Sequence, residues 1–176
     1  MQKKVDFLVI GSGIAGLSFA LKVAEKGNVC IVTKNKADET ATKYAQGGIA
    51  AVMHSPDTYE KHIKDTLIAG DDLCNEKIVR ITITESTDRV KELIDWGTHF
   101  DLTDTGKFSL GKEGGHSEYR VLHHKDNTGS EIIRALLQKA RSHKNIELLE
   151  NHFTIDLLTQ HHLGIGVSRG MPGVKC

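Results

Sequence analysis

The chain has 176 residues, an apolar fraction of 39% and a charged fraction of 26%, which is ordinary for a globular protein. Its 23 basic and 23 acidic side chains cancel, so no overall field favours nucleic acid or an anionic membrane. The three cysteines are far apart, form no CxxC pair and are odd in number, which argues against a disulfide framework.

An uncharged N-terminal stretch, residues 7–21, follows Lys3 and Lys4 and superficially resembles a signal peptide. Three glycines interrupt it where a signal needs continuous helix-forming apolar residues, and it is short for a membrane span. We therefore expect a cytoplasmic protein without a membrane span.

The first 32 residues predict a strand, a helix and a second strand in succession. Residues 5–10 form a short apolar run that ends at glycine, which is typical of a buried parallel strand. Residues 14–26 place apolar side chains on one helical face, and Gly27-Asn28 then ends the helix. Residues 29–32 are a second buried strand, which completes a βαβ unit.

Two further helices are expected after an irregular, polar segment at residues 34–48. The first begins near Asp57, just after Pro56, and runs to about Ala69. Asn75 caps the second, which ends at Trp96-Gly97. Residues 81–84 also alternate like a strand, but the length of the segment and the glycine at its end favour a helix.

The second half of the chain predicts a hairpin at residues 100–110, turning near residues 104–106, and then a loop at residues 113–127. Thr128 and Glu131 have the spacing of a capping box, and an apolar stripe behind them predicts a helix. Residues 146–149 and 153–158 look like strands. With so few strands an open sheet would expose an edge, which indicates a fragment of a longer protein.

Three glycines, Gly11, Gly13 and Gly16, have the spacing of a dinucleotide-binding loop. The first permits a tight turn, the second lets a pyrophosphate approach the backbone, and the third lets helix and strand pack closely. The N-terminus of the helix then offers N–H groups and a favourable dipole to the phosphates. Because the motif lies between a strand and a helix, we predict dinucleotide binding over a purely structural turn.

The identity of the dinucleotide stays open on these residues alone. An NAD site normally has an acidic residue ~20 residues further on, at the end of the second strand. Thr33-Lys34 occupies that place, which counts against a standard NAD site. Lys34 is equally compatible with the 2′-phosphate of NADP and with an ordinary solvated lysine.

A second glycine region, residues 44–51, surrounds Gly47-Gly48 with small residues. Such a segment lets the backbone approach a flat ring closely, although a plain loop before a helix has the same composition.

Five segments together, residues 10–17, 33–34, 44–52, 65–70 and 113–117, closely resemble the L-aspartate oxidases within the succinate dehydrogenase and fumarate reductase flavoprotein family. The resemblance covers nearly the whole chain and fades after about Asp156. It implies that the ligand is FAD and that the fold is an α/β, Rossmann-like FAD-binding domain with a parallel sheet and flanking helices. Residues 1–176 would be the N-terminal portion of that domain, truncated, without the capping and C-terminal helical domains.

The resemblance also implies which residues hold FAD. Residues 12–15 would contact the pyrophosphate, Lys34 would lie near the adenosine, and residues 41–48 would wrap the cofactor toward the flavin ring. The segment around Thr154 would touch the adenine side through its backbone. The whole implied set is Gly11, Ser12, Gly13, Ile14, Ala15, Gly16, Lys34, Ala41, Thr42, Lys43, Tyr44, Ala45, Gln46, Gly47, Gly48 and Thr154.

Ala41 separates branches of the resembled family. The respiratory members attach FAD covalently through a histidine before the Gln-Gly-Gly segment, and alignment on residues 45–48 places Ala41 there. Alanine has no nucleophilic nitrogen, so we expect non-covalent FAD. This favours an aspartate oxidase over a membrane-complex dehydrogenase subunit, although soluble fumarate reductases also bind FAD without a tether.

The resemblance implies that Glu113 helps to select the amino group of the substrate. A carboxylate near an ammonium group supplies charge complementarity that succinate cannot use, although a solvated loop glutamate is the simpler alternative. His116 either lines the active site or is structural. The ten histidines include two adjacent pairs, which rarely point to one centre, and no HExxH motif, so we expect no metal site.

The implied activity is the oxidation of L-aspartate to iminoaspartate, the first step of quinolinate and NAD biosynthesis. Oxygen or fumarate would accept the electrons, and a functional link to quinolinate synthase follows. The catalytic acid and base are expected beyond Cys176, so the fragment alone should be inactive. The alternatives are a soluble fumarate reductase or succinate dehydrogenase-type flavoprotein, and a non-catalytic FAD-binding module.

Overall fold

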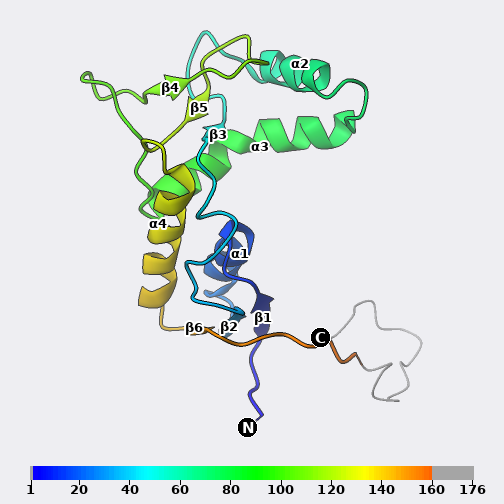
Figure 1. Ribbon diagram of the computed structural model, residues 1–176, viewed down its shortest axis with the longest axis vertical. Helices are drawn as coiled ribbons and strands as arrows, with labels where there is room; N and C mark the ends of the chain where they lie inside the picture. The colour runs from blue at the N-terminus through cyan, green and yellow to red at the C-terminus, as the bar shows by residue number, and fades with distance from the viewer. Residues whose placement is uncertain (1, 160–176) are drawn as a thin grey trace.

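The structure is a computed structural model that describes residues 2–159. Its helices and strands form two units joined end to end, a parallel sheet with two helices and a small antiparallel sheet with two more (Figure 1). In chain order they are β1 (Phe7–Ile10), α1 (Ile14–Val23), β2 (Val29–Val32), β3 (Ile49–Ala50), α2 (Tyr59–Ala69), α3 (Glu76–Asp95), β4 (Leu110–Gly111), β5 (Val121–Leu122), α4 (Thr128–Ser142) and β6 (Ile146–Leu149).

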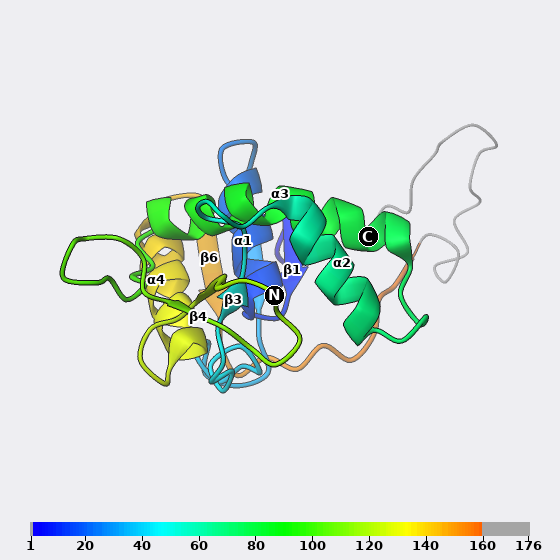
Figure 2. The ribbon, with the colours of Figure 1, turned by 90° about the horizontal axis from the view of Figure 1, so that it is seen from above.

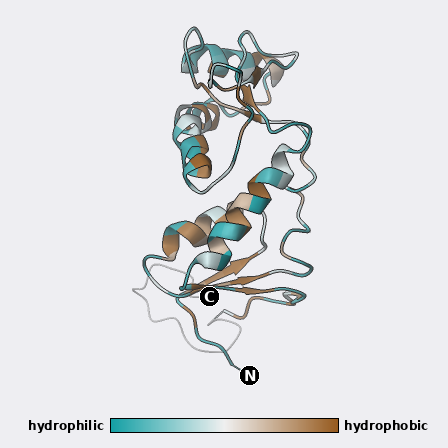
Figure 3. Ribbon diagram, turned by 90° about the vertical axis from the view of Figure 1, so that its left-hand side faces the viewer, coloured by the Kyte–Doolittle hydropathy of each residue, from teal (hydrophilic) through white to brown (hydrophobic). Residues whose placement is uncertain are grey.

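The parallel sheet has the strand order β1-β2-β6, with Phe7 paired to Val29 and Val29 paired to Ile146. This confirms the βαβ unit and the α/β fold that the sequence predicts. Helices α1 and α4 lie on the same side of the sheet, above it in Figure 3.

The main core lies between this sheet and its two helices. Val9 and Ile31 of the sheet pack with Leu17 of α1 and Leu136 of α4, and all four are buried. The other face of β1 is apolar too, but Leu8 and Ile10 are each 51% exposed. Strands that are apolar on both faces are typical of parallel sheets with helices on both sides, and the described residues cover only one side.

The antiparallel sheet has the order β3-β5-β4, with Ile49 and Leu110 both opposite Leu122. A smaller core of Ala51, Val90, Phe100 and Leu122 lies beside it. Helix α3 connects the two units, because its Leu93 belongs to the main core while its Val90 belongs to the smaller one. Viewed from above, α3 extends from the α4 side of the molecule to α2 (Figure 2).

Several sequence predictions are confirmed by these elements. The Asn75 side chain caps α3 by accepting a hydrogen bond from Ile78 N at 3.3 Å, so the strand alternative for residues 81–84 is wrong. The hairpin at residues 100–110 is present as an antiparallel bridge between Leu102 and Phe108. Its turn includes Gly106 at a φ of +78°.

Other predictions are wrong. Residues 113–127 are not one loop, since they contain β5, and β3 was not predicted either. The capping box is absent: Thr128 Oγ1 accepts from His124 N, and Glu131 binds Arg134 and His99 N instead. Residues 153–158 form no strand, and Phe153 and Ile155 are 75% and 92% exposed, because no described strand lies beside them to pair with.

Within residues 2–159, no helix combines the length and the apolar character that crossing a membrane requires.

Candidate functional site

An open cleft of about 420 Å³ lies where β1 and β2 end. In open α/β sheets, ligands bind outside the carboxyl ends of the strands, which is where this cleft is. Four segments line it, namely the glycine turn, the end of β2, the segment after it and the residues that follow β6. The lining residues are Ile10, Gly11, Ser12, Gly13, Val32, Thr33, Lys34, Glu39, Thr40, Ala41, Thr42, His152, Phe153 and Thr154.

The cleft brings together seven of the residues predicted to hold the cofactor. These are Gly11, Ser12, Gly13, Lys34, Ala41, Thr42 and Thr154. The other predicted residues, Ile14, Ala15, Gly16 and residues 43–48, do not line it. His152 and Phe153 line it although sequence reasoning missed them, because they follow β6 without a motif of their own.

The glycine turn has the geometry that its sequence predicts. Gly11 has a φ of +100°, which L side chains rarely adopt, and its N–H donates to Val32 O at 2.8 Å. A Cβ atom on Gly16 would lie 2.1 Å from the carbonyl oxygen of Gly11, so this glycine lets α1 pack closely on β1.

The N-terminus of α1 opens into the cleft at Gly13, which has no side chain to cap the helix. Thr42 Oγ1 accepts from Ile14 N at 3.2 Å and so joins the far wall of the cleft to the helix. An anion in the cleft would meet the positive end of the helix dipole.

The end of β2 carries no acidic residue. Ser12 Oγ donates to Thr33 Oγ1 at 3.1 Å, and both side chains are buried, so this bond ties the glycine turn to the end of β2. Lys34 follows at the mouth of the cleft.

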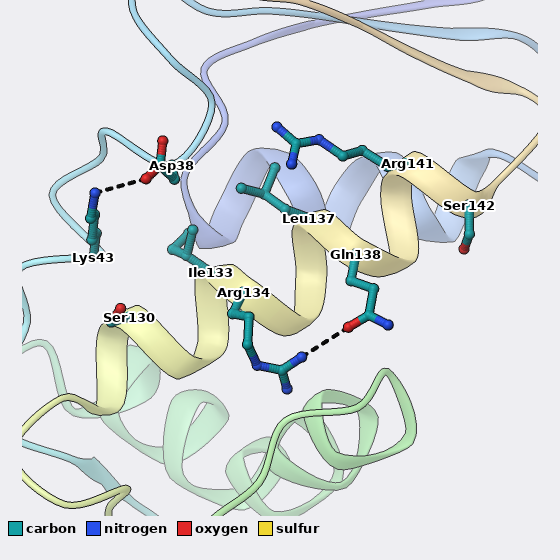
Figure 4. A pocket seen from close by; sticks show the side chains of 9 residues that line it. All are labelled: Asp38, Lys43, Ser130, Ile133, Arg134, Leu137, Gln138, Arg141 and Ser142. Carbon is teal, nitrogen blue, oxygen red and sulfur yellow. Dashed lines mark hydrogen bonds and ion pairs between the residues drawn. The ribbon is translucent and has the colours of Figure 1, made fainter.

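The side chains of Lys43 and Tyr44 bind acids of their own segment. Lys43 Nζ lies 2.7 Å from Asp38 Oδ2 and 2.6 Å from Glu39 Oε1, and these two hydrogen bonds raise the pKa of the lysine. Tyr44 donates its hydroxyl proton to Glu39 Oε2 at 2.6 Å. Lys43 lines a separate hollow of about 800 Å³ between its segment and α4, where Figure 4 shows it bound to Asp38.

Two glycines outside the cleft are required by close backbone contacts. A Cβ on Gly48 would lie 2.2 Å from Leu122 O, so β5 demands this glycine whether or not a flavin does. A Cβ on Gly129 would lie 1.7 Å from Thr42 O, and Gly129 N donates to Ala45 O at 3.0 Å. Sequence reasoning missed Gly129. The available signal was a glycine inside a predicted helix, where it is about 1 kcal/mol less favourable for helix stability than alanine.

The segment that contains Glu113, residues 113–118, is named the Glu113 loop. It joins β4 to β5 and lies beside α2 (Figure 1). Glu113 is exposed and does not line the cleft. His116 N donates to Glu113 O at 2.9 Å, and Glu113 N donates to His116 Nδ1 at 3.4 Å, so the loop closes on itself.

A buried ion-pair cluster stands at the base of this loop. Arg120, fully buried, donates through Nε and Nη2 to the two oxygens of Asp57 at 2.8 Å each, and through Nη1 to Asp65 Oδ2 at 2.5 Å. Burial raises the pKa of Asp65, but hydrogen bonds from Ser117 and Arg120 outweigh it and lower the pKa to about 2. No pattern in the sequence indicated this cluster.

Two histidines also meet between α2 and the loop. The rings of His62 and His116 make an edge-to-face contact with centroids 5.9 Å apart. Burial lowers the pKa of His62, and the charges of Arg120 and His116 add to this effect. In the part of the chain that the structure describes, no three His, Cys, Asp or Glu side chains are grouped to hold a metal ion. His161 and His162, one of the two adjacent pairs, lie outside the described residues.

The model of the FAD binding domain family matches residues 6–174. The chloroplastic L-aspartate oxidase of Oryza sativa subsp. japonica is 51% identical over 157 residues, which are 89% of this chain and 24% of that protein. The L-aspartate oxidase of Vibrio cholerae is 45% identical over 168 residues, 93% of this chain and 31% of that protein. The chain thus spans about a quarter to a third of these relatives' length.

Solved structures of two related enzymes share the fold. A quinol fumarate reductase chain from E. coli has a TM-score of 0.82 and 27% identity, covering 89% of this chain and 27% of its own. A chain of the Mycobacterium smegmatis Sdh1 complex has a TM-score of 0.75 and 35% identity, covering 84% of this chain and 27% of its own.

Proposed function

The chain belongs to the FAD binding domain family, and on that premise we propose that it is the FAD-binding portion of an enzyme that oxidises L-aspartate to iminoaspartate. The observation that carries the proposal is the 51% identity to an L-aspartate oxidase over 89% of the chain. We propose that this portion belongs to a longer enzyme, called the intact protein below, that also has capping and C-terminal helical domains.

The cleft beyond β1 and β2 supports the binding of FAD. Gly13 and the N-terminus of α1 would receive the pyrophosphate, and Lys34 would lie near the adenosine. The residues after β6, up to Thr154, would form the wall on the adenine side. Residues 43–48 lead away from the cleft, and we propose that they follow the cofactor toward the flavin ring.

Ala41 lines the cleft at the position where respiratory relatives carry a histidine tether. Its methyl group cannot form a bond to the flavin. We therefore propose that FAD is held without a covalent link, and denaturing acid should release all of it.

Bound FAD supplies the chemistry that the side chains lack, the acceptance of a hydride from the α-carbon of the substrate. This chain would contribute cofactor position and, through the carboxylate of Glu113, a partner for the substrate ammonium group. We propose that the catalytic acid and base lie in a part of the intact protein that corresponds to the unmatched part of the relatives. Oxygen or fumarate would then take the electrons, and the iminoaspartate would pass to quinolinate synthase.

The role proposed for Glu113 predicts a change in preference when Glu113→Gln is made in the intact protein. The amide keeps the shape but loses the charge that pairs with the ammonium group, so we expect kcat/KM for L-aspartate to fall about tenfold, which corresponds to about 1.4 kcal/mol. Binding of succinate, which has no ammonium group, should not weaken.

Glu118→Gln is the matched control for this prediction, because it makes the same change in the same loop at a carboxylate that is paired with Lys61 at 2.6 Å. It should leave the preference unaltered. If Glu113→Gln does not alter the preference for L-aspartate over succinate, Glu113 has no role in substrate selection.

A fumarate reductase or succinate dehydrogenase-type flavoprotein is the second candidate, and the similarity to a quinol fumarate reductase at a TM-score of 0.82 favours it. The two candidates differ in the substrate that reduces the flavin. The higher identity to aspartate oxidases places fumarate reductase second.

A cytoplasmic location stays part of the proposal. The plant relatives are chloroplastic by name, so cell fractionation with an antibody to the chain is the test. Recovery of the protein in a plastid fraction would overturn it.

A further inference from the structure

The Glu113 loop is held along one face of α2 by a series of contacts. The carboxylate of Asp65 accepts from the backbone N of Ser117 at 2.7 Å and from its hydroxyl at 2.8 Å. The other contacts run along the same helix face: Lys61 pairs with Glu118, His62 meets the ring of His116, and Ala69 lies 3.6 Å from the place of a Cβ on Gly115.

Asp65 is the point where this loop meets the buried ion-pair cluster. Both Ser117 donors and the Nη1 of Arg120 converge on a single oxygen, Oδ2 of Asp65. Arg120 is itself fixed by two hydrogen bonds to the buried Asp57. The loop is therefore bound, through Asp65, to the buried Arg120 at the start of β5.

Glu113 and Ser117 are linked by a hydrogen-bonded turn. The hydrogen bond from His116 N to Glu113 O closes the turn between them. By fixing Ser117, the Asp65 side chain therefore also fixes the backbone from which the Glu113 carboxylate extends. Glu113 itself is exposed.

We propose that Asp65 is a positioning residue, which sets the place of the Glu113 carboxylate and so the selectivity for a substrate with an ammonium group. This inference rests on the proposed function of Glu113. Asp65 touches no substrate in this arrangement and acts through Ser117 and the turn that follows Glu113.

The test uses two variants of the intact protein that perturb the contact differently. Asp65→Asn keeps an acceptor and the shape but removes the charge, while Arg120 keeps both of its bonds to Asp57. Ser117→Ala removes the hydroxyl that donates to Asp65 at 2.8 Å and accepts from Arg120 Nη2 at 3.4 Å, and it leaves the ion pairs of Arg120 in place, so it keeps the test informative where the first variant folds poorly. Lys64→Met is the control on the same helix, since Lys64 is exposed and is not among the contacts that hold the loop.

The kinetic readout separates positioning from a general loss of structure. We expect Asp65→Asn to raise KM for L-aspartate about tenfold with kcat nearly unchanged, because binding of the ammonium group is lost alike in ground and transition states. Ser117→Ala should shift KM in the same direction by less, and Lys64→Met should not shift it. Competitive inhibition by succinate should stay the same in all three.

A double variant decides whether Asp65 acts through Glu113. In a background of Glu113→Gln, the change Asp65→Asn should raise KM no further, because coupled residues are not additive. A full additional effect, or no effect of Asp65→Asn in the wild-type background, would overturn the proposal.

Hydrogen exchange of the loop amides gives a readout that needs no turnover. We expect the amides of residues 113–117 to exchange about tenfold faster in Asp65→Asn than in the wild type, with those of α1 and α4 unchanged. Equal exchange would overturn the positioning role even if the intact protein proved to oxidise another substrate. Faster exchange in a protein that does not oxidise L-aspartate would instead retain Asp65 as the loop anchor and reject the proposed function.

Discussion

Replacing Arg120 with methionine is expected to destabilise the protein by about 3–5 kcal/mol, a large part of the stability of a typical domain. The side chain is fully buried and its charge is matched by Asp57, which is also buried, and by Asp65. Methionine has a similar volume, but it leaves two carboxylates in the interior without a cation. The measurement is the thermal unfolding midpoint of the intact protein at fixed FAD concentration, which should fall by several degrees.

The pH dependence identifies the cause of that loss. In the wild type, the pKa of Asp65 is about 2, below the value of about 3.9 in an unfolded chain, so its contribution is complete above about pH 3.9 and is lost as the pH falls toward 2. In Arg120→Met the carboxylate of Asp65 has lost its cation and can be neutralised by a proton. The deficit of the variant should therefore shrink as the pH is lowered.

Arg80→Met is the control, because Arg80 also binds two carboxylates, Glu60 and Glu76, but on the exposed surface. It should cost less than about 1 kcal/mol. A similar loss in both variants, or a deficit for Arg120→Met that is independent of pH, would show that charge burial is not the cause.

Gly129→Ala is expected to weaken FAD binding by the intact protein about tenfold in Kd, which corresponds to about 1.4 kcal/mol, so the variant should retain less flavin than the wild type. A methyl group at this position would lie 1.7 Å from the carbonyl oxygen of Thr42, so the segment must move away from α4. Thr42 lines the cleft and accepts the hydrogen bond from Ile14 N at the start of α1. A small displacement there opens the wall opposite the glycine turn.

The measurement is the FAD released by acid from the folded fraction, per mole of protein. The wild type should release all of its flavin, in line with Ala41, and flavin that stays with the precipitate would contradict the non-covalent link. Gly114→Ala is the matched control, since a Cβ at Gly114 has no neighbour within 4 Å. Normal flavin content in Gly129→Ala would show that the segment at Thr42 does not form the cofactor site.

The part of the site that could be predicted from sequence is the part built by neighbours in the chain. Gly11, Gly13 and Gly16 lie within six residues, and the strand and helix around them have clear apolar patterns, so the turn and its packing follow from local rules. The same holds for α3, where Asn75 caps the helix as expected.

The rest depends on contacts between distant residues. Strands β3 and β5 are two residues long and exist because Ile49 and Leu122 pair across the small sheet. Arg120 and Asp57 are 63 residues apart, and nothing in either segment signals that both charges are buried. The capping-box prediction failed for the same reason. The Glu131 carboxylate accepts hydrogen bonds from His99 N and Arg134, and not from the backbone at the start of its own helix.

The predicted cofactor set extends beyond the residues that line the cleft. Lys43 and Tyr44 bind Asp38 and Glu39 instead of facing the cleft, and Gly48 has a structural reason in the backbone of β5. Their roles toward the flavin ring stay predictions, while Gly11, Gly13 and Lys34 meet in one cleft.

Reduction of the bound flavin in the intact protein under anaerobic conditions is the most direct test of the proposed activity. L-aspartate should bleach the visible absorbance of the flavin completely, and succinate should not. Addition of oxygen or fumarate should then restore the absorbance. Bleaching by succinate but not by L-aspartate would contradict the assignment of this chain to an aspartate oxidase.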